Sequence, residues 1–188
     1  MLAQAGPLTI RPLQETPADL QALAHWLSDP RVLEFYEGRD QPFSLADVQE
    51  KYAPRVLTAD GVQACLMVTA GQPVGYLQYE RLTAEDLQEY GLPPDANTYG
   101  LDLFIGEPEL WGRGLGRQMV ALAADWLCRQ AGVQCLTLDP HVDNLRAIRC
   151  YAACGFQTVR RLPAHELHEG RRVDCWLMIK TCEEQHES

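Results

Sequence analysis

The sequence has no long hydrophobic run. No stretch of its 188 residues approaches the roughly 18 to 20 apolar residues that a membrane-spanning helix requires. The first residues, MLAQAGPLTIRP, also lack the basic start followed by an apolar stretch that marks a signal peptide. Because both signals are absent, we expect no membrane association and a cytoplasmic location.

Cysteine spacings that bind metal are also missing. The seven cysteines contain no CxxC pair, and an odd number without framework spacing is typical of reduced thiols in the cytosol. Cys150 and Cys154 lie one turn apart on a predicted helix, which suits packing better than metal binding. We therefore expect reduced thiols and no structural metal.

Positive charge is scarce, since 26 acidic residues against 16 basic ones give a formal net charge of −10. Proteins that bind nucleic acid are normally basic, so we expect no nucleic-acid partner. Acidity by itself is most often a matter of solubility. It also fits a cationic partner, because carboxylates that line a cleft attract and orient polyamines.

The length indicates a single domain, residues 1–188, that is large enough to bury a core. Apolar periodicity, capping residues and turn residues predict a mixed order of strands and helices. The predicted strands are 8–13, 64–69, 74–79, 99–106, 134–138, 156–160 and 173–179, and the predicted helices are 17–27, 45–56, 115–129 and 144–154, before a polar tail at 182–188. This order predicts an α/β fold with one sheet and helices on both of its faces.

A glycine-rich turn, Trp111-Gly-Arg-Gly-Leu-Gly-Arg-Gln118, separates the predicted strand 99–106 from the predicted helix 115–129. Such a turn directs unpaired backbone N–H groups and the positive end of the helix dipole at one point, which suits a phosphate. A dinucleotide-binding fold would need GxGxxG after the first strand, and a P-loop would need GxxxxGK[ST]. The sequence has GxGxG after the fourth strand, so it matches neither.

The turn and a downstream helix together resemble the GNAT acetyltransferases. Their acyl-coenzyme A turn is [Arg/Gln]xxGx[Gly/Ala], which the sequence matches at Gly114 and Gly116 and leaves at Trp111. The helix that begins at Asn144, carries Tyr151 and ends before Gly-Phe156 has the paired features of that family. The resemblance covers nearly the whole chain. It implies a mixed sheet splayed between its fourth and fifth strands, and acetyl-CoA as co-substrate.

Four separated strings resemble one branch of that family, the aminoglycoside 6'-N-acetyltransferases, including the acetyltransferase domains of bifunctional acetyltransferase–phosphotransferase resistance enzymes. The strings are RVLEFYEGRD (31–40), YGLDLFIGEPELWGRGLG (99–116), LDPHVDNLRAIRCY (138–151) and LPAHELHEGRRVDCWLM (162–178). Trp111 recurs in that branch. The resemblance therefore implies acetylation of a 6'-amine, by direct transfer without a metal or a covalent enzyme intermediate.

The resemblance also implies two catalytic residues. An amine must lose a proton before it attacks a thioester, and Asp102 is the implied general base or amine anchor. Strand alternation places Asp102 on the side of Gly100 and Phe104. Tyr151 is the implied partner of the leaving thiolate. The structural alternatives are a strand carboxylate that faces solvent for Asp102 and a tyrosine that anchors the core for Tyr151.

The remaining implied residues divide between the two substrates. The expected coenzyme-binding residues are Phe104, Ile105, Trp111, Gly112, Arg113, Gly114, Leu115, Gly116, Arg117, Asn144 and Tyr151. The expected acceptor-binding residues are Tyr36, with an aromatic face toward a sugar ring, Asp95 at the pocket rim, Asp102, Asp139 and Glu166. The structural alternatives are helix-capping packing for Tyr36 and ordinary turn chemistry for Asp139-Pro140.

The string His165-Glu166-Leu167-His168-Glu169 differs from the HExxH motif of zinc helices. We expect it to form a structural loop in a turn before the last strand. The expected function is an acetyl-CoA-dependent aminoglycoside 6'-N-acetyltransferase that confers antibiotic resistance. An acetyltransferase of another amine (a protein N-terminus, a siderophore precursor or a polyamine) and a non-catalytic acyl-CoA-binding module are the alternatives. Both a monomer and a homodimer fit the sequence.

Overall fold

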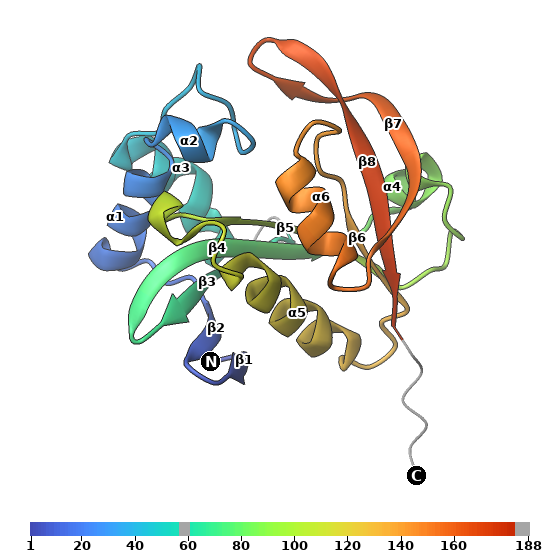
Figure 1. The fold of residues 1–188 in the computed structure, drawn as a ribbon, viewed down its shortest axis with the longest axis horizontal. Helices are drawn as coiled ribbons and strands as arrows, with labels where there is room; N and C mark the ends of the chain where they lie inside the picture. The colour runs from blue at the N-terminus through green and yellow to red at the C-terminus, as the bar shows by residue number, and fades with distance from the viewer. Residues whose placement is uncertain (57–60, 183–188) are drawn as a thin grey trace.

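A computed structural model describes residues 1–56 and 61–182, which fold around one eight-stranded sheet (Figure 1). The strand order is β1-β2-β3-β4-β5-β6-β8-β7, and all neighbours are antiparallel except β5 and β6. The strands are β1 (Ala3–Ala5), β2 (Leu8–Pro12), β3 (Gln63–Thr69), β4 (Gln72–Arg81), β5 (Thr98–Ile105), β6 (Cys135–Leu138), β7 (Gln157–His168) and β8 (Arg171–Thr181). The predicted α/β class is confirmed.

Helices cover both faces of the sheet, as expected (Figure 1). They are α1 (Pro17–Trp26), α2 (Pro30–Leu33), α3 (Leu45–Val56), α4 (Ala84–Tyr90), α5 (Leu115–Cys128) and α6 (Leu145–Ala152), with a 3-10 turn at Pro108–Leu110. One buried cluster joins α5 to the sheet, and a second joins α1 and α3 to the opposite face. Within 1–56 and 61–182, no helix has the length and apolarity needed to cross a membrane.

Several elements differ from those expected. No helix was predicted between residues 27 and 45, but the Asp29 side chain accepts from the N–H of Arg31 and caps the short helix α2. No element was predicted between residues 79 and 99, and a capping box between Thr83 and Asp86 starts α4 there. The strand β1 was not predicted. Apart from Cys182, the predicted polar tail lies outside the described residues.

The expectation of a structural loop at 165–169 is wrong. Residues up to His168 belong to β7, because Glu166 pairs with Val173 and His168 pairs with Arg171 of β8. An irregular register between Leu162 and Glu166 interrupts the ladder. The turn is confined to Glu169 and Gly170, which both have positive φ.

The expectation that all cysteines are reduced is also wrong. Cys128, at the end of α5, forms a disulfide with Cys182, and their Cα atoms are 5.1 Å apart. β8 pairs antiparallel with β6, and just beyond this pairing the N–H of Cys182 donates to the carbonyl of Gln134 at 2.8 Å. These contacts hold Cys182 in place beside the end of α5. The other five cysteines are free thiols.

Gly106 follows β5 and packs directly under the buried indole of Trp26. A Cβ atom at this position would lie 2.1 Å from a ring atom of Trp26. We expect Gly106→Ala to lower the free energy of unfolding by about 1–3 kcal/mol, because the indole must move in a packed core. Urea unfolding measures the change.

Gly116→Ala is the control for that variant, since its Cβ would come no closer than 3.4 Å to a neighbouring side chain and it lies within α5 without positive φ. Alanine at a helical position without a clash is neutral or stabilising. Equal urea midpoints for Gly106→Ala and the wild type would contradict the packing described for Trp26.

The strands β5 and β6 part soon after they meet. They pair in parallel only from Thr98↔Cys135 to Gly100↔Thr137. Beyond Gly100, β5 continues to Ile105 in register with β4. This parting is the splay expected between the fourth and fifth strands of the sequence-based order, and it opens the sheet beside Asp102.

Candidate active site

A cleft of about 920 Å³ lies where β5 and β6 part. Its walls come from β4 and β5, the segment around α2, the start of α5, α6, and the strand β7. The predicted residues that line it are Tyr36, Asp102, Phe104, Ile105, Trp111, Gly112, Gly114, Gly116, Arg117, Asp139, Asn144, Tyr151 and Glu166. The parting of the two strands therefore brings together most of the residues expected at the site.

Asp102 lies on β5 at the floor of this cleft. Its side chain is open to the solvent of the cleft, but its carboxylate is enclosed deeply enough for desolvation to dominate its titration. Burial, and then the negative charges of Asp139, Glu166 and Glu37, raise the pKa of Asp102 to about 7. A carboxylate with this pKa can accept a proton at neutral pH and release it again.

Two neighbours orient the Asp102 carboxylate. Gln78, its cross-strand partner on β4, places Nε2 3.5 Å from Oδ2. A hydrogen bond from the Tyr36 hydroxyl lowers the pKa of Asp102 and partly opposes the effect of burial. The strand alternation expected for β5 is observed, since Leu101 packs in the α5-side cluster and Phe104 packs against the opposite one.

Tyr36 does not offer the open aromatic face that we expected for a sugar ring. Its side chain is buried, and its ring lies 4.5 Å from that of Phe104, centroid to centroid. A second contact joins it to the ring of Tyr76. The part of Tyr36 that serves the cleft is the hydroxyl at Asp102, because the ring is held in the core.

Tyr151 projects from α6 into the cleft. Burial is the largest cause that raises its pKa, and the negative charge of Asp102 raises it further. The phenol therefore keeps its proton at neutral pH and can donate a hydrogen bond to an anionic sulfur. Its ring also contacts Phe156, 6.3 Å away between centroids, so the core-anchoring role and the cleft position coexist.

The glycine turn has the geometry of an anion seat. Gly112 and Gly114 have φ of 72° and 81°, and the first α5 hydrogen bond runs from the N–H of Gln118 to the carbonyl of Gly114. The N–H groups of residues 115–117 therefore precede the helical ladder and point from the positive end of the dipole. Arg117 lines the cleft beside them.

Trp111 is fixed at the start of this turn. Its indole Nε1 donates to the carbonyl of Ile105 at 3.0 Å, and the guanidinium of Arg146 lies 3.9 Å from the ring centroid. Asn144 caps α6, accepting from the N–H of Ala147 at 3.1 Å. Each of these contacts holds a cleft segment in place.

Three predicted residues are not among those that line the cleft in the described structure: Asp95, Arg113 and Leu115. Asp95 is exposed before the start of β5, where Asn97 is tied to the carbonyl of Gly132. Asp95 is not among the residues that line the cleft, and its place at the pocket rim stays a prediction. Arg113 and Leu115 can contribute through backbone N–H groups of the turn.

The acidic wall of the cleft is held by hydrogen bonds. The Asp139 Oδ2 atom is 3.0 Å from both the Tyr90 hydroxyl and His165 Nε2. Glu166 Oε2 is 2.9 Å from His141 Nε2, which raises the pKa of His141. No role for His141 or His165 was expected from the sequence. Their contacts with the two carboxylates depend on the pairing of β7 with β8, which the sequence does not reveal.

Glu37 and Gln78 were also missed. Glu37 has a positive φ of 67° and accepts from the Lys51 ammonium at 2.6 Å and from the Tyr52 hydroxyl at 3.2 Å. Gln78 could have been found from the sheet register, since it lies opposite Asp102 on β4.

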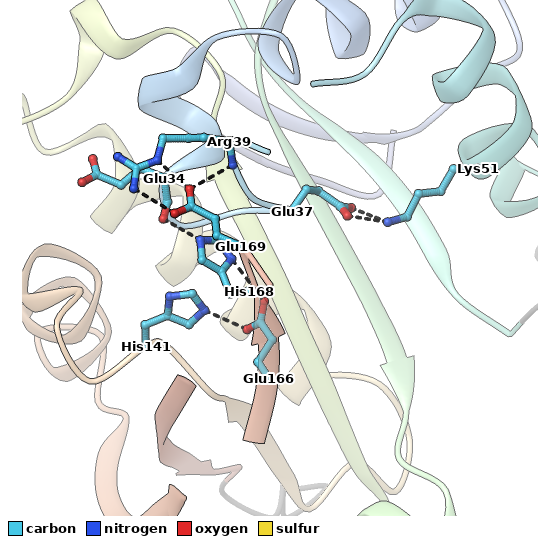
Figure 2. Close-up of polar contacts among 8 residues, drawn as sticks. All are labelled: Glu34, Glu37, Arg39, Lys51, His141, Glu166, His168 and Glu169. Carbon is cyan, nitrogen blue, oxygen red and sulfur yellow. Dashed lines mark hydrogen bonds and ion pairs between the residues drawn. The ribbon is translucent and has the colours of Figure 1, made fainter. Parts of the chain in front are cut away.

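A set of four residues, which we call the clasp, joins the segment after α2 to the turn between β7 and β8 (Figure 2). Arg39 pairs with Glu169 through Nε–Oε1 at 2.5 Å and Nη2–Oε2 at 2.9 Å. His168 Nε2 lies 3.0 Å from the carbonyl oxygen of Glu34. Arg39 lowers the pKa of Glu169 to about 2, so the ion pair persists at neutral pH.

Among the described residues, one group has the composition of a metal site. Ligand atoms of His141, Glu166 and Cys175 lie within 4.8 Å of one another. Burial raises the pKa of Cys175 to about 12, so its thiol keeps its proton at neutral pH. The side chains of the other two residues, His141 and Glu166, already engage each other in a hydrogen bond.

Comparisons with known proteins agree with this geometry. Residues 15–163 match the acetyltransferase (GNAT) domain. The aminoglycoside N(6')-acetyltransferase type 1 of Klebsiella pneumoniae is 34% identical over 143 residues, covering 76% of this chain and 71% of the relative.

Solved structures give the same picture. The aminoglycoside acetyltransferase AAC(6')-Ib in complex with coenzyme A and kanamycin superposes with a TM-score of 0.72 at 28% identity, covering 93% of this chain and 94% of that one. The spermidine N-acetyltransferase of Vibrio cholerae, 18% identical, has a TM-score of 0.75 with 95% and 97% covered, and shares the fold. With its splayed sheet, glycine turn and matched domain, the chain belongs to the GNAT family of acetyltransferases.

Proposed function

We propose that this enzyme transfers acetyl from acetyl-CoA directly to the 6'-amine of aminoglycosides of the kanamycin and tobramycin type. The observation that carries the proposal is Asp102, a carboxylate with a pKa of about 7 on the floor of an acidic cleft that ends at the glycine turn. Two of the named similar proteins are aminoglycoside acetyltransferases at 34% and 28% identity, which supports the same acceptor class here.

The carboxylates of the acidic wall act first, by attracting the cationic substrate. An aminoglycoside is a polycation at neutral pH, and Asp139, Glu166 and Glu37 attract it into the cleft. Asp102 then takes the proton of the ammonium group that is to react. The free amine can attack the thioester carbon only after this transfer.

The start of α5 and the strand β5 serve the other substrate. Backbone N–H groups of the glycine turn would hold the pyrophosphate of coenzyme A, with Arg113 and Arg117 near its phosphates. Backbone N–H groups of β5 beyond its parting from β6 are the donors for the oxyanion, near Phe104 and Ile105. Tyr151 donates to the leaving thiolate, because its phenol stays protonated.

Acetylation would remove a positive charge that the antibiotic uses to bind ribosomal RNA, so resistance is part of the proposal. A cytoplasmic location is also part of it, because acetyl-CoA and ribosomes are available there. We propose that residues 1–188 act as one catalytic domain. The second candidate is a polyamine acetyltransferase, which the acidic cleft also suits.

Thiol release from acetyl-CoA tests the proposal. We expect kcat/KM of at least about 10⁴ M⁻¹s⁻¹ with kanamycin or tobramycin, the lower range for an enzyme on its own substrate. A matched aminoglycoside that carries a hydroxyl in place of the 6'-amine should give no N-acetylated product. Faster release with spermidine or a peptide amine than with every 6'-amino compound would reject the aminoglycoside assignment.

A further inference from the structure

A chain of hydrogen bonds runs from α4 through His165 to the acceptor wall. His165 Nδ1 lies 2.8 Å from Glu89 Oε1, and His165 Nε2 lies 3.0 Å from Asp139 Oδ2. The imidazole is largely enclosed, with 16% of its side chain exposed, whereas Glu89 and Asp139 are more open. Three segments distant in sequence therefore meet at one ring.

The two partners dictate the charge of this ring. A neutral imidazole has one N–H donor, and a carboxylate is an acceptor only. Since each ring nitrogen faces a carboxylate oxygen, both hydrogen bonds form only when His165 is an imidazolium. The hydrogen bond to Asp139 is the largest cause that raises the pKa of His165, with Glu89 adding to it and burial opposing it.

The other groups around the ring are compatible with this charge. On α4, Tyr90 donates its hydroxyl to Asp139 and places its ring 6.0 Å from that of His165, between centroids. From β8, Arg172 Nη1 donates to the His165 carbonyl at 3.0 Å rather than to the ring. The groups that contact the ring nitrogens are therefore both anionic.

We infer that His165 is a positioning residue: held as an imidazolium between Glu89 and Asp139, it fixes the Asp139 carboxylate toward the acceptor amine. His165 and Tyr90 both engage Oδ2, so the carboxylate is held in one orientation and an incoming ammonium group meets Oδ1. This inference rests on the proposed function, because it requires an amine acceptor at Asp139.

The imidazolium has a second consequence for the reaction. The negative charge of Asp139 is one cause that raises the pKa of Asp102. A cation next to Asp139 offsets that charge, so removing it should raise the pKa of Asp102 further. As the pH is lowered, the rate of a variant without this cation should begin to fall at a higher pH than the rate of the wild type, because Asp102 accepts a proton only in its carboxylate form.

His165→Gln tests the inference, since glutamine keeps a donor but carries no charge. We expect the KM for kanamycin to rise about tenfold, the usual effect of losing a charge-assisted hydrogen bond, with the KM for acetyl-CoA unchanged. The acid limb of the pH–rate profile should move to higher pH. His25→Gln, on the exposed side of α1, is the matched control and should match the wild type.

A purely structural role would instead lower stability and leave the KM for kanamycin and the acid limb unchanged. That result would overturn the inference. Glu89→Gln gives an independent measurement, because Glu89 is half exposed and contacts the other ring nitrogen of His165. In histidine NMR titrations, the signal that disappears in His165→Gln should titrate at lower pH in Glu89→Gln than in the wild type.

The NMR result also separates the two proposals. If wild-type enzyme releases no thiol with kanamycin, the proposed function fails, whereas the titration still reports whether His165 is held as an imidazolium. A neutral His165 at pH 7 would overturn the inference whatever the acceptor is. A wild-type KM for kanamycin in His165→Gln would do the same while the proposed function stands.

Discussion

Asp102→Asn is expected to lower kcat by at least about 100-fold while coenzyme A binds as in the wild type. Asparagine preserves the shape of the side chain but cannot take a proton from the ammonium, and general-base catalysis contributes about 10²–10⁴-fold. The glycine turn that would bind coenzyme A comes after Ile105 in the chain, so the substitution at Asp102 leaves the turn unchanged. Thiol-release kinetics and calorimetry with coenzyme A measure the two effects.

The pH dependence makes this prediction more specific. Because the pKa of Asp102 is about 7, wild-type activity should be present above that pH and decline as the pH falls through it. The small residual activity of Asp102→Asn should lack this limb. Asp125→Asn, on the exposed side of α5, is the matched control. If Asp102→Asn retained the wild-type rate, Asp102 would not be the base.

Cys182→Ser is expected to lower the free energy of unfolding by about 4 kcal/mol, an effect of the chain entropy released when a long loop is opened. The disulfide spans a sequence separation of 54 residues, and the loop it closes contains β6, α6, β7 and β8. The cross-link restricts the unfolded chain, so its loss favours unfolding. Urea unfolding measures the difference.

A reductant provides the internal comparison for that experiment. Wild-type protein treated with reductant should lose about as much stability as Cys182→Ser, and the variant should lose little more. Cys135→Ser removes a free thiol from β6 and is the matched control. Equal stability of oxidised wild type and Cys182→Ser would show that the cross-link contributes nothing to folding.

The features predicted from sequence are those that local rules determine. Asp102 was assigned to the correct side of β5 because side chains alternate along any strand. The glycine turn was placed because its residues and the helix after it are contiguous. The start of the first helix at residue 17 was predicted for the same reason, and the Thr16 hydroxyl caps it by accepting from the N–H of Asp19.

The features that were missed depend on contacts between distant segments. His165 was assigned to a loop because its strand exists only through pairing with β8. The cysteines of the disulfide have no local spacing, since the pairing of β8 with β6 and the packing of α5 against the sheet bring them together.

The clasp has a consequence for how acceptor range can evolve. It joins residues 34–39 to residues 168–169, whereas the glycine turn is a continuous segment that none of these residues enters. The acceptor wall and the coenzyme seat are thus separate modules on one sheet. Substitutions in the clasp can shift the neighbouring cleft residues Glu37 and Glu166 while the geometry of the glycine turn is retained.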